Sequence, residues 1–273
     1  MILLTIMTYL VEILSFLMLF LGLLISFSHS VYQMIPFYRW QCLCLALITW
    51  ITGVDLFIGE TRLPAQAGSI IFLFSLVPFV LFLLIEPLLA QATVSEGLRG
   101  LSWFLRLIHK RYRKEILYRA KIVWLSSRPA SDNLVRTILV DMVLLGLAFV
   151  TSFYLFGSLE RQASIQFSAS TLAVSLSLLL LGISAMSRKE DIISQVVGLL
   201  VMEQGMFLAA LRLVGDTLSG STLHDGLMQI KTVFIIGLLL YTFITLTILV
   251  YLLPELHRVS GSIDVKRQNL LKG

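Results

Sequence analysis

Long apolar runs, separated by short polar segments, make up most of this chain of 273 residues. A bilayer core about 30 Å thick requires about 20 apolar residues for each helix that crosses it. Runs of about this length occur seven times: Leu3–Ser26, Gln41–Ile58, Gly68–Leu89, Thr137–Phe156, Phe167–Met186, Ile192–Val214 and Thr232–Leu253. The pattern predicts an all-α integral membrane protein with about seven transmembrane helices. The mean hydropathy of +0.92 agrees, because it is far too high for a soluble globule.

The distribution of Lys and Arg predicts how this bundle is oriented. With the N-terminus outside, the inward-facing segments hold 17 of the 21 basic residues, ten of them between Arg99 and Arg136. This asymmetry is the positive-inside pattern, and it predicts a protein of the cell inner membrane with its C-terminus in the cytoplasm. The first run lacks a basic flank and a small-x-small cleavage site, so we expect a membrane helix there and not a signal peptide. Three segments result: an N-terminal three-helix segment (1–91), a cytoplasmic basic loop (92–136) and a C-terminal four-helix segment with a cytoplasmic tail (137–273).

The cytoplasmic loop 92–136 carries an amphipathic pattern. Apolar side chains recur at helical spacing, and basic side chains fall largely on other faces of the helix: Leu98, Leu101, Leu105, Ile108 and Tyr112 against Arg106, Lys110, Arg113 and Lys114. Such a helix lies at a membrane surface with its cations facing lipid phosphates. Docking of a soluble or peripheral partner needs the same pattern and stays open. The interleaved apolar residues argue against binding of nucleic acid.

One acidic residue, Glu203, lies near the middle of the run Ile192–Val214. An acidic side chain at that depth costs roughly 2.5–3.5 kcal/mol on insertion scales, and such residues usually serve a moving proton or cation. The alternative is a protonated glutamate that hydrogen-bonds to a neighbouring helix, since polar contacts between membrane helices are common. We expect Glu203 to take part in an ion path.

Other polar residues within the apolar runs extend this candidate path. Three of them, Gln204, Glu86 and Asp141, join Glu203 as candidate proton- or ion-path residues. Several carboxylates lie close enough to the ends of their runs to reach interfacial water, which is the alternative to an ion-path role: Glu12, Asp55, Glu86 and Asp141. A hydrogen-bonded relay through further side chains is also open: Gln195, Thr242, Thr245 and Thr247.

The sequence shows no motif for independent catalysis. The only cysteines, Cys42 and Cys44, point about 200° apart on a helix, which predicts neither a disulfide nor a shared metal site. The histidines are scattered over four segment ends, and neither a Gly-rich phosphate loop nor a Ser–His–Asp arrangement occurs. We therefore expect no cofactor, no metal and no small-molecule substrate.

The run Ser187–Gly205, SRKEDIISQVVGLLVMEQG, resembles the signature of component E of hydrogenase-4, in which a basic turn leads into a helix with Gly and then Met-Glu-Asn-Gly. Gly261–Val265 and Leu271–Gly273 are similar to the closing motifs of that family, and Tyr38–Gln41 loosely resembles a segment that opens its second helix. The resemblance implies a non-catalytic membrane subunit of a redox-driven, ion-translocating complex, either hydrogenase-4/formate hydrogenlyase-like or complex I-related. The partners it implies are other membrane subunits, including antiporter-like ones.

The last three runs also resemble the K subunit of complex I, a three-helix unit with an outside N-terminus. The K subunit carries its second-helix Glu at the place of Leu200, and no carboxylate lies near Tyr241 and Thr242, where its third-helix Glu would be. The first three runs and the last three runs would cross the membrane in the same order of directions. This agreement predicts an internal repeat, in which Gln41 is the counterpart of the Glu203 region.

Two functions of other classes stay open. A self-sufficient secondary transporter would contain broken helices and several central charges facing one cavity. A non-transporting scaffold or assembly subunit would use the loop 92–136 to hold a peripheral partner.

Overall fold

Five long helices and one shorter helix make up the part of the chain that the structure, a computed structural model, describes. The described residues are 2–28, 30–59, 75–87, 89, 118, 134–160, 169–189 and 192–219. The long helices and the shorter one are, in chain order, α1 (Ile2–Phe27), α2 (Val31–Gly59), Ser75–Pro87, α6 (Leu134–Glu160), α7 (Ala169–Arg188) and α8 (Ile192–Ser219). These ranges contain no strand.

Each of the five long helices contains a span that is long and apolar enough to cross a membrane. The prediction of an all-α membrane protein is therefore confirmed for the described residues. The predicted helix Thr232–Leu253, the tail that follows it and nearly all of the loop 92–136 lie outside them. The count of seven helices and the amphipathic loop stay predictions.

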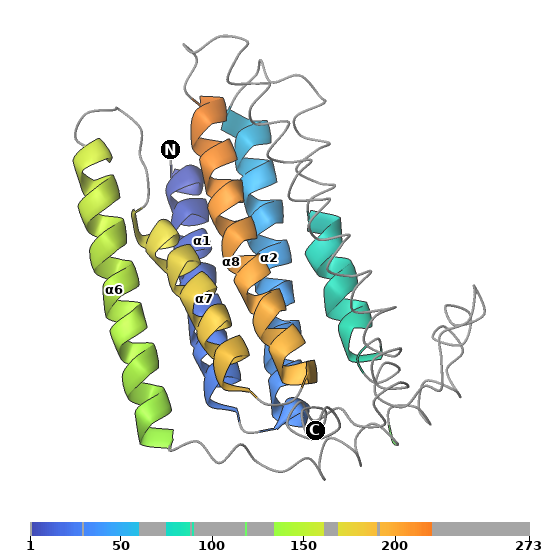
Figure 1. The fold of residues 1–273 in the computed structure, drawn as a ribbon. Helices are drawn as coiled ribbons and strands as arrows, with labels where there is room; N and C mark the ends of the chain where they lie inside the picture. The colour runs from blue at the N-terminus through green and yellow to red at the C-terminus, as the bar shows by residue number, and fades with distance from the viewer. Residues whose placement is uncertain are drawn as a thin grey trace, which may run out of the picture.

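Two antiparallel hairpins form the centre of the bundle (Figure 1). Helices α1 and α2 form one hairpin and α7 and α8 the other, with α1 packed against α7 and α2 against α8. Helix α6 stands at one edge, where it packs mainly on α7, and the helix Ser75–Pro87 lies beside α2. The turns of both hairpins and the start of α6 lie at the same end of the bundle, the lower end in Figure 1.

A lysine joins the turns of the two hairpins. Residues 28–30 connect α1 to α2, and residues 189–191 connect α7 to α8. The ammonium group of Lys189 donates a hydrogen bond to the backbone carbonyl of Ser28. Because this carbonyl lies just beyond the end of α1, the cation also faces the negative pole of that helix. The lower ends of the hairpins are thereby held together.

The predicted start of the second helix, Gln41, was wrong, because α2 begins ten residues earlier at Val31. Pro36 and the polar residues that follow it interrupt the apolar run, so hydropathy placed them outside the membrane helix. In the structure Pro36 lies in the second turn of α2, where its missing N–H removes one backbone hydrogen bond. Tyr38 and Gln41 are 1% and 0% exposed, so they face protein and not lipid. A hydropathy average does not distinguish these two environments.

Helices α7 and α8 approach closely because glycines lie where they meet. A Cβ atom on Gly182 would lie 2.6 Å from the backbone nitrogen of Met202 and 2.7 Å from the carbonyl oxygen of Gly198. Side chains do not tolerate such distances, so glycine is required here, as in other small-residue contacts between membrane helices. The contact fixes the position of α8 next to Met202, and with it the position of Glu203.

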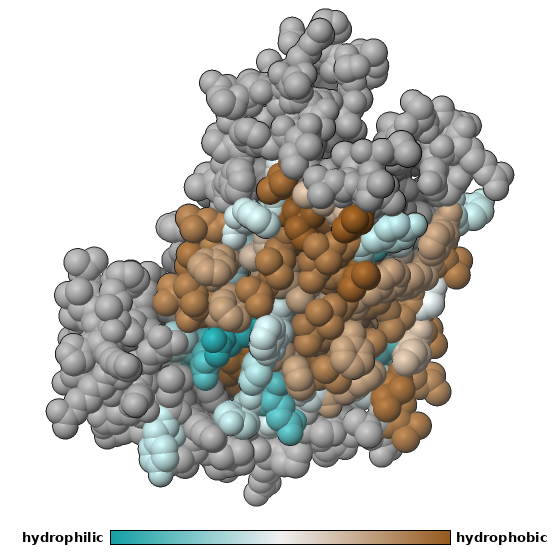
Figure 2. Space-filling model, turned by 180° about the vertical axis from the view of Figure 1, so that it is seen from behind, coloured by the Kyte–Doolittle hydropathy of each residue, from teal (hydrophilic) through white to brown (hydrophobic). Residues whose placement is uncertain are grey.

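The outer surface of the described bundle is mostly apolar. Figure 2 shows hydrophobic residues over most of the described part of the face opposite to that of Figure 1, with the strongest hydrophilic colour in its lower half. Helix α6 is the most exposed of the five, since only 17% of its span is buried, and four of its apolar residues are between 61% and 80% exposed: Val135, Leu139, Val150 and Tyr154. In a membrane such a surface contacts lipid tails or other membrane helices.

Candidate intramembrane ion site

Glu203 lies at the middle of the membrane span of α8. It is the eleventh of the nineteen residues of Ile193–Leu211, and it is 5% exposed. The side chain therefore faces the helix bundle and not lipid, as is usual for an ionisable residue at this depth. The part of Glu203 in an ion path stays a prediction.

Helix α2 supplies two of the side chains near Glu203. Tyr38 and Cys42 are four residues apart, so they share one face of α2, and they are 1% and 0% exposed. The amide Nε2 of Gln204 donates a hydrogen bond to the Sγ atom of Cys42 at 2.9 Å, and the Tyr38 hydroxyl lies close to both groups. Glu203 lies close enough to Tyr38 and Cys42 for electrostatic interaction with both. We call Tyr38, Cys42, Glu203 and Gln204 the Glu203 cluster.

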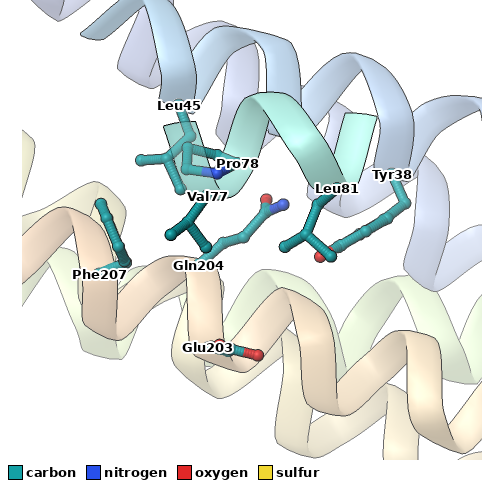
Figure 3. A pocket seen from close by; sticks show the side chains of 8 residues that line it. All are labelled: Tyr38, Leu45, Val77, Pro78, Leu81, Glu203, Gln204 and Phe207. Atoms are coloured by element: carbon teal, nitrogen blue, oxygen red, sulfur yellow. The ribbon is translucent and has the colours of Figure 1, made fainter. Parts of the chain in front are cut away.

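A small cavity adjoins the Glu203 cluster, between α8, α2 and the helix Ser75–Pro87 (Figure 3). Among the described residues, three polar and five apolar ones line it: Tyr38, Glu203 and Gln204, and Leu45, Val77, Pro78, Leu81 and Phe207. The volume open to the centre of a water-sized sphere is about 10 Å³, which is about the least that holds one water molecule. Figure 3 shows the Gln204 side chain extending from α8 between Val77 and Leu81, whereas Glu203 projects from a neighbouring side of the helix.

One polar end of the Gln204 amide has no hydrogen-bond partner among the described residues. The unpartnered atom is Oε1, in a residue that is 3% exposed, while Nε2 is bonded to Cys42. The orientation of an amide is assigned from its hydrogen bonds, and the reversed orientation would place the nitrogen where Oε1 now lies. In both orientations a buried polar atom beside the cavity lacks a protein partner, and such atoms are usually bonded to ordered water.

Glu86 forms an ion pair with Arg39 at the edge of the same helix group. The Arg39 Nη1 atom lies 2.5 Å from the Glu86 Oε2 atom, and Arg39 Nε donates to the backbone oxygen of Phe82 at 3.2 Å. The guanidinium also lies over the Phe82 ring, 5.1 Å from its centroid. The two paired side chains are 30% and 32% exposed, so they are partly open to the surroundings. Since Arg39 follows Tyr38 directly, the pair lies next to the Glu203 cluster along α2.

Asp141 belongs to a separate polar network at the lower end of the bundle. Its carboxylate accepts hydrogen bonds from the hydroxyls of Ser26 at 2.5 Å and Ser184 at 3.0 Å, and it lies 2.7 Å from Arg188 Nη2. Asp141 is 0% exposed, so the alternative of a solvated carboxylate at a run end is wrong for this residue. Arg188 ends α7, whereas Glu203 follows the first residue of α8 by eleven positions, or roughly 16 Å along the axis. The two carboxylates therefore lie at different depths.

The other sequence-predicted residues are distributed over the bundle. Gln195 donates to the Lys189 carbonyl at 2.9 Å at the start of α8, and Gln41 donates to the Met18 carbonyl of α1 at 3.1 Å. Gln41 and Glu203 are the eleventh and twelfth residues of their helices, but the internal repeat stays a prediction. Glu12 accepts a hydrogen bond from Ser170 at 3.2 Å. The Asp55 side chain lies outside the described part of the structure, and so do three threonines: Thr242, Thr245 and Thr247.

Sequence reasoning missed Tyr38, Cys42 and Arg39 as parts of the site. Two signals could have identified them. Tyr38 and Cys42 have the i, i+4 spacing that places two side chains on one helix face. Arg39 lies within an apolar region, where a basic side chain needs a carboxylate partner such as Glu86.

The Glu203 cluster combines a carboxylate, a phenol, a thiol and an amide. All four form hydrogen bonds, and three of them can exchange protons. Within the described ranges, no group of three or more His, Cys, Asp or Glu side chains is arranged to hold a metal ion. No protein-family model, curated protein or solved structure matches the chain.

Proposed function

We propose that the protein is a non-catalytic membrane subunit of a redox-driven, ion-translocating complex, in which Glu203 takes up and releases the ion. The observation that carries this proposal is a carboxylate at mid-span, 5% exposed, beside a water-sized cavity that Tyr38 and Gln204 also line. A purely structural carboxylate needs only a hydrogen-bond partner. An ion path also needs space for a water molecule or an ion and neighbours that exchange protons, and the Glu203 cluster has both.

Two further carboxylates extend the proposed path toward the lower end of the bundle. The pair of Arg39 and Glu86 is about one-third exposed and adjoins Tyr38, which suits a connection between the surroundings and the Glu203 cluster. The buried Asp141 would be a second site nearer that end. We assign the lower end to the cytoplasm, because Arg188 and Lys189 lie there and basic residues concentrate on that side of the membrane. The N-terminus is then outside.

The likeness of Ser187–Gly205 to component E of hydrogenase-4 supports membership of a larger complex. Electron transfer in other subunits would supply the energy. A cation that approaches Glu203 from a neighbouring antiporter-like subunit would stabilise its ionised form, and withdrawal of that cation would favour protonation. The exposed apolar face of α6 offers area for contacts with such neighbours or with lipid, and the loop 92–136 would rest on the lipid surface.

The two alternative functions find less support. A stand-alone secondary transporter typically uses discontinuous helices at its central site, whereas α8 runs unbroken through Glu203. A scaffold subunit would have no use for a carboxylate beside a water-sized cavity at mid-span. Both alternatives nevertheless make distinct biochemical predictions.

Isolation of the protein under mild conditions distinguishes these functions. The chain would be extracted in a gentle detergent and its associated proteins identified by mass spectrometry after native electrophoresis. We expect co-migration with antiporter-like and redox subunits in one complex whose electron transfer drives ion uptake into vesicles. A chain that migrates alone and transports ions when reconstituted would contradict the proposal, as would a complex without redox activity.

A further inference from the structure

The described residues around the cavity beside Glu203 supply few side-chain oxygen atoms. Of the eight described residues that line it, Tyr38, Glu203 and Gln204 have polar side chains, and the other five are apolar. Its volume of about 10 Å³, for the centre of a water-sized sphere, is at the lower limit for a single water molecule. The cavity therefore has room for one small hydrogen-bonding molecule.

The unpartnered end of the Gln204 amide provides one hydrogen-bonding group for such a molecule. This residue is 3% exposed, and its other amide atom is fixed by the bond to Cys42 at 2.9 Å, so Cys42 positions the amide. A buried water molecule usually makes two to four hydrogen bonds, roughly three on average. Tyr38 and Glu203 line the same cavity, and a hydroxyl and a carboxylate are groups that can provide the others.

We infer that the cavity binds one water molecule, held by Gln204, Tyr38 and Glu203, and that the ion exchanged at Glu203 is a proton and not Na⁺. This inference rests on the function proposed above. A hard cation such as Ca²⁺ or Mg²⁺ takes about six or more oxygen ligands, and Na⁺ also binds through oxygen. The three polar side chains that the described residues place around this water-sized cavity do not form such a shell. A proton needs only an acceptor and a hydrogen-bonded donor.

The proton reaches Glu203 through the water molecule without any net change in that molecule. A proton that reaches the water molecule forms a third O–H bond on its oxygen. Another O–H bond of the same molecule then breaks, and that proton bonds to a carboxylate oxygen of Glu203. The water molecule is restored and Glu203 becomes neutral. Release is the reverse sequence, with the proton leaving toward the next acceptor.

Infrared difference spectroscopy on the purified complex, recorded across a change of pH, tests this site. The carboxyl band of Glu203 is identified by its loss in Glu203→Gln, and a water O–H band is identified by its shift in H₂¹⁸O. Gln204→Leu removes the amide, and Val77→Leu fills the cavity while keeping the amide. Gln41→Leu is the matched control, because Gln41 is also buried, bonded through Nε2 and unpartnered at Oε1 among the described residues, but faces α1.

We expect the water band in the wild type and in Gln41→Leu, and its loss in Gln204→Leu and Val77→Leu, with proton pumping per electron lowered roughly tenfold or more in those two. Adding NaCl at constant pH should leave the Glu203 carboxyl band unchanged. A saturable change of that band with Na⁺ would overturn the assignment of the ion, while Glu203 would keep its role in transport. A water band that is absent from the wild type, or the same in all variants, would overturn the water site.

Discussion

The carboxylate of Asp141 on α6 lies 2.7 Å from the guanidinium of Arg188 at the end of α7, with the two side chains 0% and 18% exposed. Helix α6 otherwise presents a mainly apolar surface, and only 17% of its span is buried. The hydroxyls of Ser26 and Ser184 bond to the same carboxylate, so this network joins α6, α1 and α7. The ion pair therefore holds an edge helix in one position on the hairpins.

Removal of one partner from this pair should destabilise the protein strongly. Asp141→Asn leaves the largely buried Arg188 charge without its carboxylate partner, and breaking a buried pair costs up to roughly 3–5 kcal/mol. Thermal stability of the detergent-purified protein, followed by size-exclusion of a fluorescent fusion, would measure the loss. Glu86→Gln is the matched control, because its pair with Arg39 is about one-third exposed, and we expect a loss of roughly 1 kcal/mol or less.

The double variant Asp141→Asn with Arg188→Gln checks the cause. If the two groups act through one ion pair, the double variant should be less destabilised than the sum of the single variants. Additive losses would show that the pair does not carry the effect.

The contact of Gly182 with α8 predicts a second stability effect. Gly182→Ala places a Cβ atom 2.6 Å from the Met202 nitrogen, so α8 must move away, and we expect a loss of roughly 1–3 kcal/mol. Gly146→Ala on α6 is the control, since its Cβ would meet nothing within 4 Å among the described residues, and alanine favours helix. The same melting assay would compare the two. Equal stability of both variants would contradict the close α7–α8 packing.

The orientation of the bundle can be tested with single introduced cysteines. Arg113→Cys lies in the predicted cytoplasmic loop, which precedes the first residue of α6. Glu160→Cys lies at the last residue of α6, at the other end of that helix. The native Cys42 and Cys44 are buried and should not react with an impermeant maleimide in intact cells. We expect Glu160→Cys to be labelled from outside and Arg113→Cys only after the membrane is opened. Labelling of both from outside would rule out the predicted topology.

The fold was predictable from sequence where an apolar run is long and interrupted only by single polar residues or short polar pairs. The runs that correspond to α1, α7 and α8 meet this condition, and their predicted ends lie within a few residues of those observed, except that α8 continues to Ser219. The start of α2 was not predictable in this way, because Tyr38 and Gln41 are polar but enclosed by other helices. Enclosure depends on tertiary packing, which a run of apolar residues along one chain segment does not report.

The same distinction applies to the site. Glu203 and Gln204 were predicted because the depth of a residue within a span follows from counting along the chain. Cys42 could be paired with Gln204 only from the packing of α2 on α8. The ion pair of Asp141 likewise depends on how α6 lies against α7. Sequence therefore indicated which residues are deep in the membrane, and packing decided which of them meet.

The central claim is that Glu203 carries the ion by gaining and losing a proton. Glu203→Gln keeps the size and hydrogen bonding of the side chain and removes its charge. Pumping would be measured in closed inverted vesicles as acidification per electron transferred, beside Glu203→Asp and the control Glu12→Gln, a half-buried glutamate bonded to Ser170. The Asp variant should retain part of the activity, because its carboxylate is one methylene short, and the control should pump normally.

For Glu203→Gln we predict a complex of normal abundance that still transfers electrons to an artificial acceptor, while pumping falls roughly tenfold or more. Pumping by Glu203→Gln at the wild-type rate would contradict the account and leave Glu203 as a structural hydrogen-bonding residue.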